Sequence, residues 1–413
     1  MEQNPLYSPC WLTMRSNGFH PGAYIASLSL SYLALGVTLP AMSLIVVSKG
    51  YSLEYLAVIM VIYSISVMGG EVPSGVFADT KGRKASFLLG LAFSLAGTLC
   101  VLFDSLILLS LGFLLTGLGR AFGSGSLDAK YIEDGQKAGK KLEDIVFSLE
   151  INSGISLTLG ALLGGYLLTL GRGGSSLTRP LLLVRIVFLV VSAIVVVCSI
   201  KEVVDRGDQR SSYAEQFRLF ISVLRSSPFL FFYSASVLLQ GMLLASLESY
   251  WQPYLTQLLK DDSLLWLLGM TTVLIFSISI LGSLIGKKIV QVKRPTGVYC
   301  ILFLLIYGLQ ILLSLRTNII YFLVLFSFIY FFLGILSVVG TYVLNKVAED
   351  RVRTSMISLS SFSLQAGGVL TNLFASSLFL IGGIALFWKV SALVGVVGIF
   401  LLAKPLLQRF PRS

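Results

Sequence analysis

Three ionisable residues stand inside long apolar segments, where a charge needs a partner or water. Counted from the predicted inner ends of their segments at about 1.5 Å per helical residue, Glu71, Arg120 and Glu150 lie at a similar depth, about 9 to 12 Å into a membrane. Two acids opposite one arginine leave a surplus negative charge, and a low-dielectric site favours protonation of one acid. The three residues therefore predict either a proton-coupling site or a structural cluster that ties helices together.

Of the two acids, Glu150 is favoured as the proton carrier, with Arg120 as its counter-charge. Glu71 stands two residues before Pro73, where it is expected to stabilise a turn. Polar side chains in the apolar segments are also candidates for a substrate cavity: Tyr32, Arg120, Gln240, Glu248, Tyr330 and Gln365. Packing is the competing interpretation for the tyrosines and glutamines. Trp251 and Tyr254, just after Glu248, are expected in the aromatic belt at the outer membrane surface.

The sequence offers little for other chemistry. His20 is the only histidine, and the four cysteines contain no C-x-x-C pair, so we expect no metal site, no cofactor and no disulfide framework. A membrane enzyme would need clustered histidines or aspartates at the membrane surface, and the sequence shows no such cluster. The chain is therefore predicted not to be an enzyme.

Composition indicates that lipid surrounds most of the chain. Of 413 residues 55% are hydrophobic and 12% charged, whereas a soluble surface needs roughly 25% charged residues. The net charge of +11 comes from short basic clusters between apolar runs, which is typical of membrane topology and argues against nucleic-acid binding. The expected partners are membrane lipid, a small-molecule substrate and protons, and we expect a monomer.

Twelve apolar segments are long enough to cross a bilayer, so we predict an all-α integral membrane protein. They cover residues 22–47, 54–78, 85–103, 106–129, 145–170, 180–200, 229–255, 264–284, 297–315, 319–344, 355–380 and 384–402. The longest polar interruption divides them six and six. We therefore predict an N-terminal six-helix bundle at 1–200, a linker with an amphipathic helix at 201–227 and a C-terminal six-helix bundle at 228–413.

Lysines and arginines set the predicted orientation. Most of the 31 lie in the two tails and the even-numbered connections, while Arg120 and Arg185 fall inside apolar segments. Because basic residues gather on the cytoplasmic side, both termini and the linker are predicted to be cytoplasmic, in the cell membrane.

A basic loop joins the second and third segments. It reads G-x-x-x-D-x-x-G-R-K, with Gly75, Asp79, Gly82, Arg83 and Lys84 at its fixed positions. Gly82 permits the positive φ of a short reversal, and Asp79 can accept hydrogen bonds from the N-terminus of a helix. A nonspecific basic loop explains the cations but not the two glycines and Asp79.

This loop resembles the signature between helices 2 and 3 of the major facilitator superfamily of secondary transporters. Thr80 departs from the family pattern, which often has a basic residue there. The resemblance implies twelve helices in two bundles and alternating access. It also implies that an acid at the end of helix 4, Asp128 or Glu133, pairs with Arg83.

A second motif lies on the fifth segment. Gly160, Ala161, Gly164 and Gly165 resemble the antiporter motif of drug-exporting members, with Ala161 where the family has proline. Small residues at this spacing are also ordinary helix packing in membranes. The motif favours proton-driven export of amphipathic or lipophilic molecules, a multidrug-type antiporter. Proton-coupled uptake, or export of one specific metabolite, is the alternative.

The predicted topology can be tested directly. A cysteine placed near Arg210 should stay unlabelled by an impermeant thiol reagent in intact cells and become labelled once the membrane is permeabilised, because the linker is predicted to be cytoplasmic. Labelling from outside intact cells would reverse the orientation.

Overall fold

A computed structural model describes residues 20–171, 173–202, 228–259, 261–290, 295–315, 318–347 and 353–409, without the side chains of 175, 262 and 353–358. Within these ranges every regular element is a helix. The elements are α1 (Pro21–Thr38), η2 (Leu39–Ala41), α2 (Leu44–Val47), α3 (Leu53–Lys81), α4 (Arg83–Val101), α5 (Leu106–Gly123), α6 (Ser126–Lys137), α7 (Leu142–Thr169), η3 (Gly174–Ser176), α8 (Arg179–Ser199), α10 (Pro228–Glu248), α11 (Trp251–Leu259), η4 (Asp262–Leu264), α12 (Trp266–Ile289), α13 (Pro295–Leu313), α14 (Ile319–Val347) and α15 (Arg353–Arg409). Helices suit lipid because they satisfy their backbone hydrogen bonds internally.

The helices match the predicted membrane spans. Eleven stretches of the described chain are long and apolar enough to cross a membrane. The last belongs to α15, which is broken at Gly382 and Gly383, where φ of Gly383 is 65°, and so comprises two helices. The prediction of an all-α integral membrane fold is confirmed, and the predicted bounds differ from the observed ones by a few residues.

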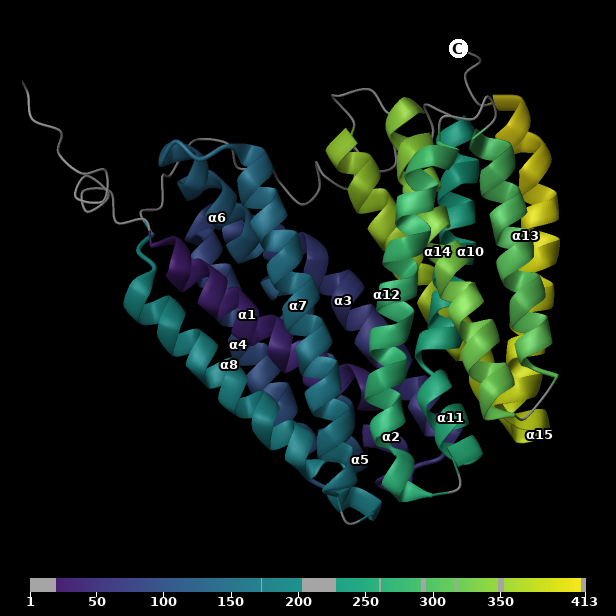
Figure 1. The fold of residues 1–413 in the computed structure, drawn as a ribbon, viewed down its shortest axis with the longest axis horizontal. Coiled ribbons are helices and arrows are strands. Elements are labelled where there is room, and N and C mark those ends of the chain that lie inside the picture. Colours follow the sequence, from purple (N-terminus) through teal and green to yellow (C-terminus); the bar gives the residue numbers. More distant parts are fainter. Residues whose placement is uncertain are drawn as a thin grey trace, which may run out of the picture.

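The helices form two groups that meet along two lines (Figure 1). Helices α1–α8 make one group and α10–α15 the other, and the groups contact each other through α3 with α15 and α7 with α12. The groups lie close together at the end that carries α2 and α11 and diverge toward the end that carries α6. The domain boundaries at 200 and 228 stay a prediction, and residues 203–227, with the predicted amphipathic helix, lie outside the described residues.

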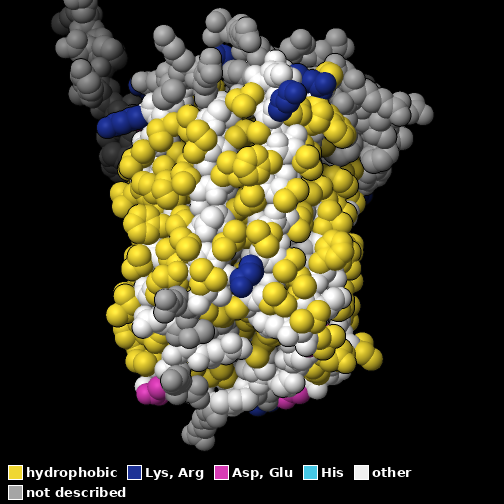
Figure 2. Space-filling model, turned by 90° about the vertical axis from the view of Figure 1, so that its right-hand side faces the viewer, with side chains coloured by type: hydrophobic (Ala, Val, Ile, Leu, Met, Phe, Trp, Pro, Cys, Tyr) yellow, Lys and Arg dark blue, Asp and Glu magenta, His cyan; other side chains and the backbone are white. Residues whose placement is uncertain are grey.

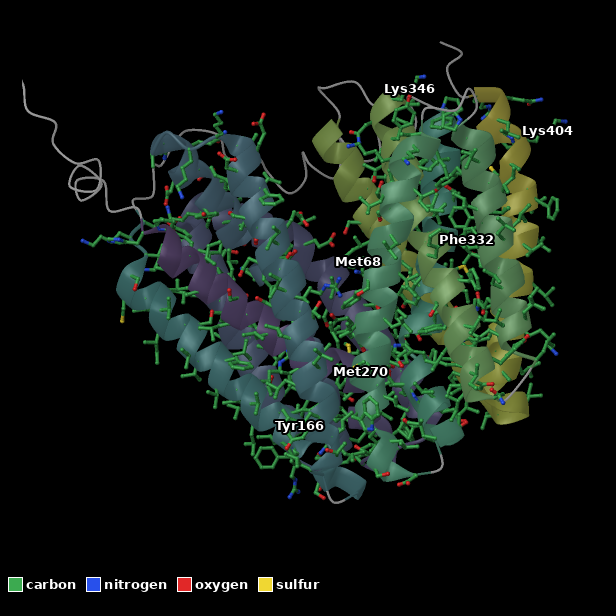
Figure 3. The ribbon with its side chains drawn as sticks, in the orientation of Figure 1. Met68, Tyr166, Met270, Phe332, Lys346 and Lys404 are labelled. Atoms are coloured by element: carbon green, nitrogen blue, oxygen red, sulfur yellow. The ribbon has the colours of Figure 1, made fainter. Side chains whose placement is uncertain are left out.

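A broad apolar band covers the face of the molecule drawn in Figure 2. Most basic side chains on this face gather at one end, one lies midway along the band, and acidic side chains lie at the other end. In Figure 3 Lys346 and Lys404 lie toward the end where the C-terminus is, and Tyr166 lies toward the opposite end. This distribution is what the basic-residue asymmetry of the sequence predicts, and the assignment of one end to the cytoplasm stays a prediction.

The aromatic residues after Glu248 correct one expectation. Trp251 and Tyr254 are 3% and 5% exposed and pack against Phe326 and Phe322 of α14. The chain breaks between α10 and α11, so these rings turn into the C-terminal bundle and do not reach the lipid. They belong to its core and form no part of an interfacial belt.

Glycines allow α7 and α12 to touch. A Cβ atom on Gly165 would lie 2.8 Å from the Cα atom of Gly269, closer than real Cβ atoms approach backbone. The predicted antiporter-like motif therefore serves two contacts: Gly165 faces α12 of the other group, whereas Gly160 and Gly164 face α1 and η2 of their own group. The contact of Gly165 brings the backbones of the two groups together at one of the two lines where the groups meet.

Two alanine variants of α7 should shift stability in opposite directions. Gly165→Ala should lower the unfolding temperature of the purified protein, because its methyl group would push α12 away. Gly154 on the same helix has open space around it, so Gly154→Ala should raise that temperature slightly. The reason is the higher helix propensity of alanine, which adds about 0.5–1 kcal/mol of stability. Equal shifts in the two variants would argue against the close contact.

Candidate functional site

A cavity of about 230 Å³ lies between the two groups of helices. Of the described residues that line it, two carry charge: Arg120 from α5 and Glu248 from the end of α10. Both are accessible through the cavity yet enclosed by the surrounding protein. The cavity thus presents one cation from the first group of helices and one anion from the second.

Arg120 is held by a tyrosine. Its Nη1 donates a hydrogen bond of 3.2 Å to the hydroxyl oxygen of Tyr63 on α3. Glu248 and Glu71 lie near enough to stabilise its charge, but no described carboxylate comes within ion-pair distance of 4.0 Å. Glu248 in turn has no hydrogen-bond or ion-pair partner among the described residues. Opposite charges therefore face one cavity without being joined.

The cavity is closed at the end that carries α2 and α11. Ser43 Oγ donates a hydrogen bond of 2.5 Å to the backbone oxygen of Ser249, and Gln252 Nε2 donates one of 3.1 Å to the backbone oxygen of Leu39. Each bond joins one group of helices to the other. The two groups of helices are therefore joined at this end, which the sequence predicts to be the outer one.

The predicted cavity residues divide in two. Glu248, Tyr330, Gln365 and Arg120 line the cavity. Gln240 is half-buried on α10 and does not line it, and the hydroxyl of Tyr32 donates a hydrogen bond of 3.1 Å to Asp128 Oδ1 away from it. The polar lining residues not predicted from the sequence include Tyr63, Gln252 and Asn372. All three stand inside predicted spans, but a position along a span does not show which face of the helix turns toward the cavity, so the sequence did not single them out.

Glu71, Arg120 and Glu150 do not form one cluster. Glu71 Oε1 accepts a hydrogen bond of 2.6 Å from Ser361 Oγ on α15, so it bridges the two groups of helices. Glu150 is exposed on α7 and lies near Tyr32 and Asp128. Equal depth in the membrane does not fix the direction in which a side chain points, and no described contact joins Glu150 to Arg120. The predicted Glu150–Arg120 pair is absent from this structure.

The signature loop is a reversal between α3 and α4. Gly82 has a φ of 99°, and Arg83 Nη2 forms an ion pair of 2.8 Å with Glu133 Oε1, one of the two acids expected for it. The other, Asp128, contacts Tyr32 instead. Asp79 is exposed and has no hydrogen bond or ion pair with any described residue. It does not cap a helix in this structure, contrary to the expectation.

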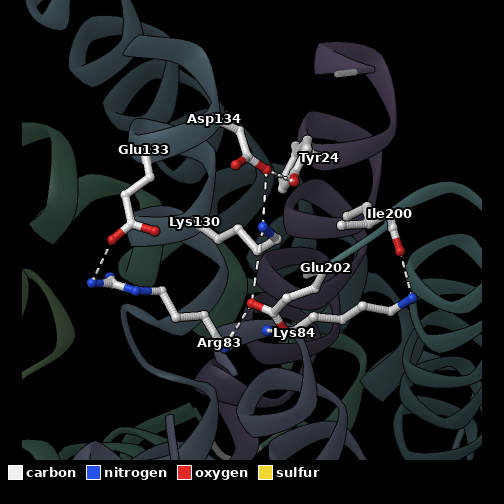
Figure 4. A network of polar contacts seen from close by, with 8 residues as sticks. All are labelled: Tyr24, Arg83, Lys84, Lys130, Glu133, Asp134, Ile200 and Glu202. Atoms are coloured by element: carbon white, nitrogen blue, oxygen red, sulfur yellow. Dashed lines mark hydrogen bonds and ion pairs between the residues drawn. The ribbon is translucent and has the colours of Figure 1, made fainter. Parts of the chain in front are cut away.

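Glu202 caps the helix instead (Figure 4). Its two carboxylate oxygens accept hydrogen bonds of 2.9 Å from the backbone N–H groups of Arg83 and Lys84 at the start of α4. Lys130 Nζ lies 3.9 Å from Glu202 Oε1 and 3.0 Å from Asp134 Oδ2. A carboxylate at a helix N-terminus is stabilised by the free N–H groups and the helix dipole. This network ties the end of α8 to the signature loop.

Metal binding has no basis in these residues. The described part of the chain contains no group of three or more histidine, cysteine, aspartate or glutamate residues that could hold an ion.

The fold and the enclosed cavity define a membrane transport protein. No family model matches the sequence. An uncharacterized MFS-type transporter, YxaM of Bacillus subtilis (strain 168), is 26% identical over 414 residues, 91% of each chain. The fold is similar to that of the nucleoside transporter NupG, with a TM-score of 0.75 at 13% identity over 93% of this chain and 98% of that one. It is also similar to a bacterial homologue of the human lysosomal transporter Spinster, inward-facing and unoccupied, with a TM-score of 0.69 at 15% identity over 98% and 100%.

In sequence and in fold the chain is thus similar to transporters of the major facilitator type. It is a multi-pass membrane protein, and the proteins that it resembles are transporters and not enzymes.

Glu202→Gln should weaken the signature loop more than Asp79→Asn does. The glutamine can accept one of the two backbone hydrogen bonds but brings no charge to the helix N-terminus, a loss of about 1 kcal/mol. The unfolding temperature of purified protein should therefore fall for Glu202→Gln and stay near that of the unmodified chain for Asp79→Asn. The reverse order would show that Asp79 carries the cap in the folded protein.

Proposed function

We propose that the protein is a proton-coupled secondary transporter of amphipathic small molecules that works by alternating access. The observation that supports it best is the pair of opposite charges in the cavity, Arg120 on one group of helices and Glu248 on the other. A charge inside a membrane protein is costly, so residues of this kind usually serve transport. The cell membrane as its location, a cytoplasmic position of both termini and a monomeric state are part of the proposal.

Glu248 is the proposed proton site. It has no partner among the described residues, so neither protonation nor ionisation would break a bond that holds the fold. When it is ionised, Arg120 across the cavity attracts it and favours closing of the cavity. When it is protonated, that attraction is lost and the cavity is free to stay open and bind substrate. Its two states thus favour different conformations, which is what coupling requires.

The sequence favoured Glu150 as the proton carrier. Its surroundings in the structure support that role less well than those of Glu248. Glu150 lies near Asp128, so two acids share one region without an adjacent arginine ion pair. No described hydrogen bond or ion pair joins Glu150 to Arg120. We therefore rank Glu150 after Glu248 as the coupling residue, and the two are compared in the experiment below.

The cavity lining supports an amphipathic substrate. Apolar side chains, among them Met60, Ile275 and Phe276, share the wall with Arg120 and Glu248. The apolar residues can receive a hydrophobic body, and the polar ones fix its orientation. The fold itself does not choose a substrate, because proteins of different cargo share it.

Two directions of coupling follow from separate observations. The motif of Gly160, Ala161, Gly164 and Gly165 favours export in exchange for protons, the multidrug-type antiport expected from the sequence. Co-transport of proton and substrate is favoured by the charges of the N-terminal helices. There Arg120 and Arg185 line cavity space, and no described carboxylate forms an ion pair with either. The assay below separates the two by the sign of the pH gradient that drives accumulation.

Glu248→Gln should uncouple transport from the pH gradient. In liposomes that contain a pH-sensitive dye, the unmodified chain should move protons when a substrate from a compound panel is added, and an imposed gradient should drive accumulation. Glutamine mimics the protonated acid, so the variant should lose both proton movement and gradient-driven accumulation but keep exchange of labelled for unlabelled substrate.

Two matched variants make the result specific. Glu150→Gln tests the coupling residue favoured from the sequence, and Glu143→Gln, exposed at the start of the same helix, should behave as the unmodified chain. Full coupling in Glu248→Gln would remove it as the proton site, and loss of coupling in Glu150→Gln alone would restore the original assignment. Transport by the unmodified chain that ignores pH gradients would overturn proton coupling.

A further inference from the structure

A second arginine lies inside the N-terminal helices. Arg185 lies in the first half of α8 and lines a hollow of about 50 Å³ beside the central cavity. The hollow and the cavity share Leu39, Met42 and Tyr63 in their walls. The two spaces are therefore neighbours.

Arg185 lacks a counter-charge. Its Nη1 donates a hydrogen bond of 2.6 Å to Thr38 Oγ1, while its Nε is buried without a hydrogen-bond partner. No described carboxylate forms an ion pair with it, and none lines the hollow. Buried arginines are normally paired, because an isolated charge in a low-dielectric interior is destabilising. A guanidinium that lines a hollow, has an unpartnered Nε and has no described carboxylate beside it points to an anionic ligand.

Tyr63 connects the two arginines. Its hydroxyl accepts the hydrogen bond from Arg120, and the same ring lies close enough to Arg185 to affect its electrostatics. The hydroxyl keeps its own proton available for donation. An anionic group beside Tyr63 would thus meet Arg185 on one side and the Tyr63–Arg120 pair on the other.

The size of the hollow limits the group that fits. A water molecule needs about 10–15 Å³ of such volume, so the hollow has room for about three or four waters, comparable to one carboxylate. Apart from Arg185, Tyr63 and three threonines, Thr38, Thr98 and Thr116, the lining is apolar. Arginine matches a planar carboxylate with two parallel hydrogen bonds.

We propose that Arg185 binds the carboxylate of an amphipathic organic anion whose apolar body lies in the central cavity. The inference rests on the proposed transport function and adds the chemical class of the substrate. It also assigns Arg185 as a specificity residue, with Tyr63 and Arg120 as the groups that complete the anion site. Glu248, on the opposite wall, disfavours a second negative charge on the substrate.

Binding of matched probes tests the site without any gradient. The probes are phenylbutyrate and its uncharged amide, phenylbutyramide, which share shape and apolar body. Stabilisation of the purified protein against heat, titrated with each probe, gives an apparent affinity. The carboxylate should stabilise the unmodified chain, and the amide should bind at least about tenfold more weakly, the usual contribution of a charged hydrogen-bond pair.

Variants of α8 locate the effect. Arg185→Gln should weaken phenylbutyrate binding about tenfold or more and leave the weak amide binding unchanged, while Arg185→Lys should keep part of the preference for the anion. Arg179→Gln, at the exposed start of the same helix, is the matched control and should bind both probes as the unmodified chain does. Without ligand, Arg185→Gln should unfold at or above the temperature of the unmodified chain, because it removes an unpaired buried charge.

Each alternative outcome overturns the site. Equal binding of carboxylate and amide, no binding of phenylbutyrate by the unmodified chain, or full binding by Arg185→Gln would each exclude an anion site at Arg185. A large loss of stability in unliganded Arg185→Gln would show that the arginine serves the fold. Because these measurements need no proton gradient, the site can hold while proton coupling fails, and coupling can hold while the site fails.

Discussion

The cost of a charge in a low-dielectric interior organises this structure. Lipid gives no partner to a polar group, so the chain satisfies its backbone inside helices and places most lysines and arginines beyond their ends. The few ionisable side chains left between the ends are then conspicuous. The carboxylate of Glu71 accepts a hydrogen bond from Ser361, and this bond joins the two groups of helices. Arg120, Arg185 and Glu248 form no ion pair with any described residue and line cavity space instead.

At the ends of the helices, where water is near, charged side chains form ion pairs. Arg83 pairs with Glu133, and Lys130 pairs with Asp134 and Glu202. Surface pairs of this kind contribute little each, but Glu202 also satisfies two backbone donors at the start of α4. Since Glu202 is the last described residue before the linker region, the network anchors the end of the N-terminal bundle to its own signature loop. The loop is thereby held rigid within one bundle.

The sequence predicted correctly the features that depend on the lipid environment. Twelve spans and their approximate ends follow from apolar length, and the pairing of Arg83 with an acid after α5 follows from the family resemblance. The predictions failed where they depended on the direction in which a side chain leaves its helix. Glu150 and Arg120 share a depth but point to different places, and Trp251 turns inward because the helix breaks before it. Glu202 stands past the last apolar residue of its span, where an acid looks like ordinary solvent-facing linker. Arg185 was placed inside a span, but only the structure shows that no carboxylate of the described residues forms an ion pair with it.

The charge of the substrate and the sign of proton coupling are linked through Arg120. An anion in the site competes with ionised Glu248 for the same guanidinium, so protonation of Glu248 and binding of the anion favour each other. Two ligands that favour each other travel together, which is co-transport. A cationic substrate would instead compete with the proton for Glu248, and mutual exclusion gives exchange. The anion site inferred at Arg185 therefore favours co-transport over the antiport suggested by the glycine motif of α7. Gly165 of that motif packs α7 against α12, and Gly160 and Gly164 pack α7 against α1. The motif therefore bears on how the helices meet, and the sign of coupling follows from the charges in the cavity.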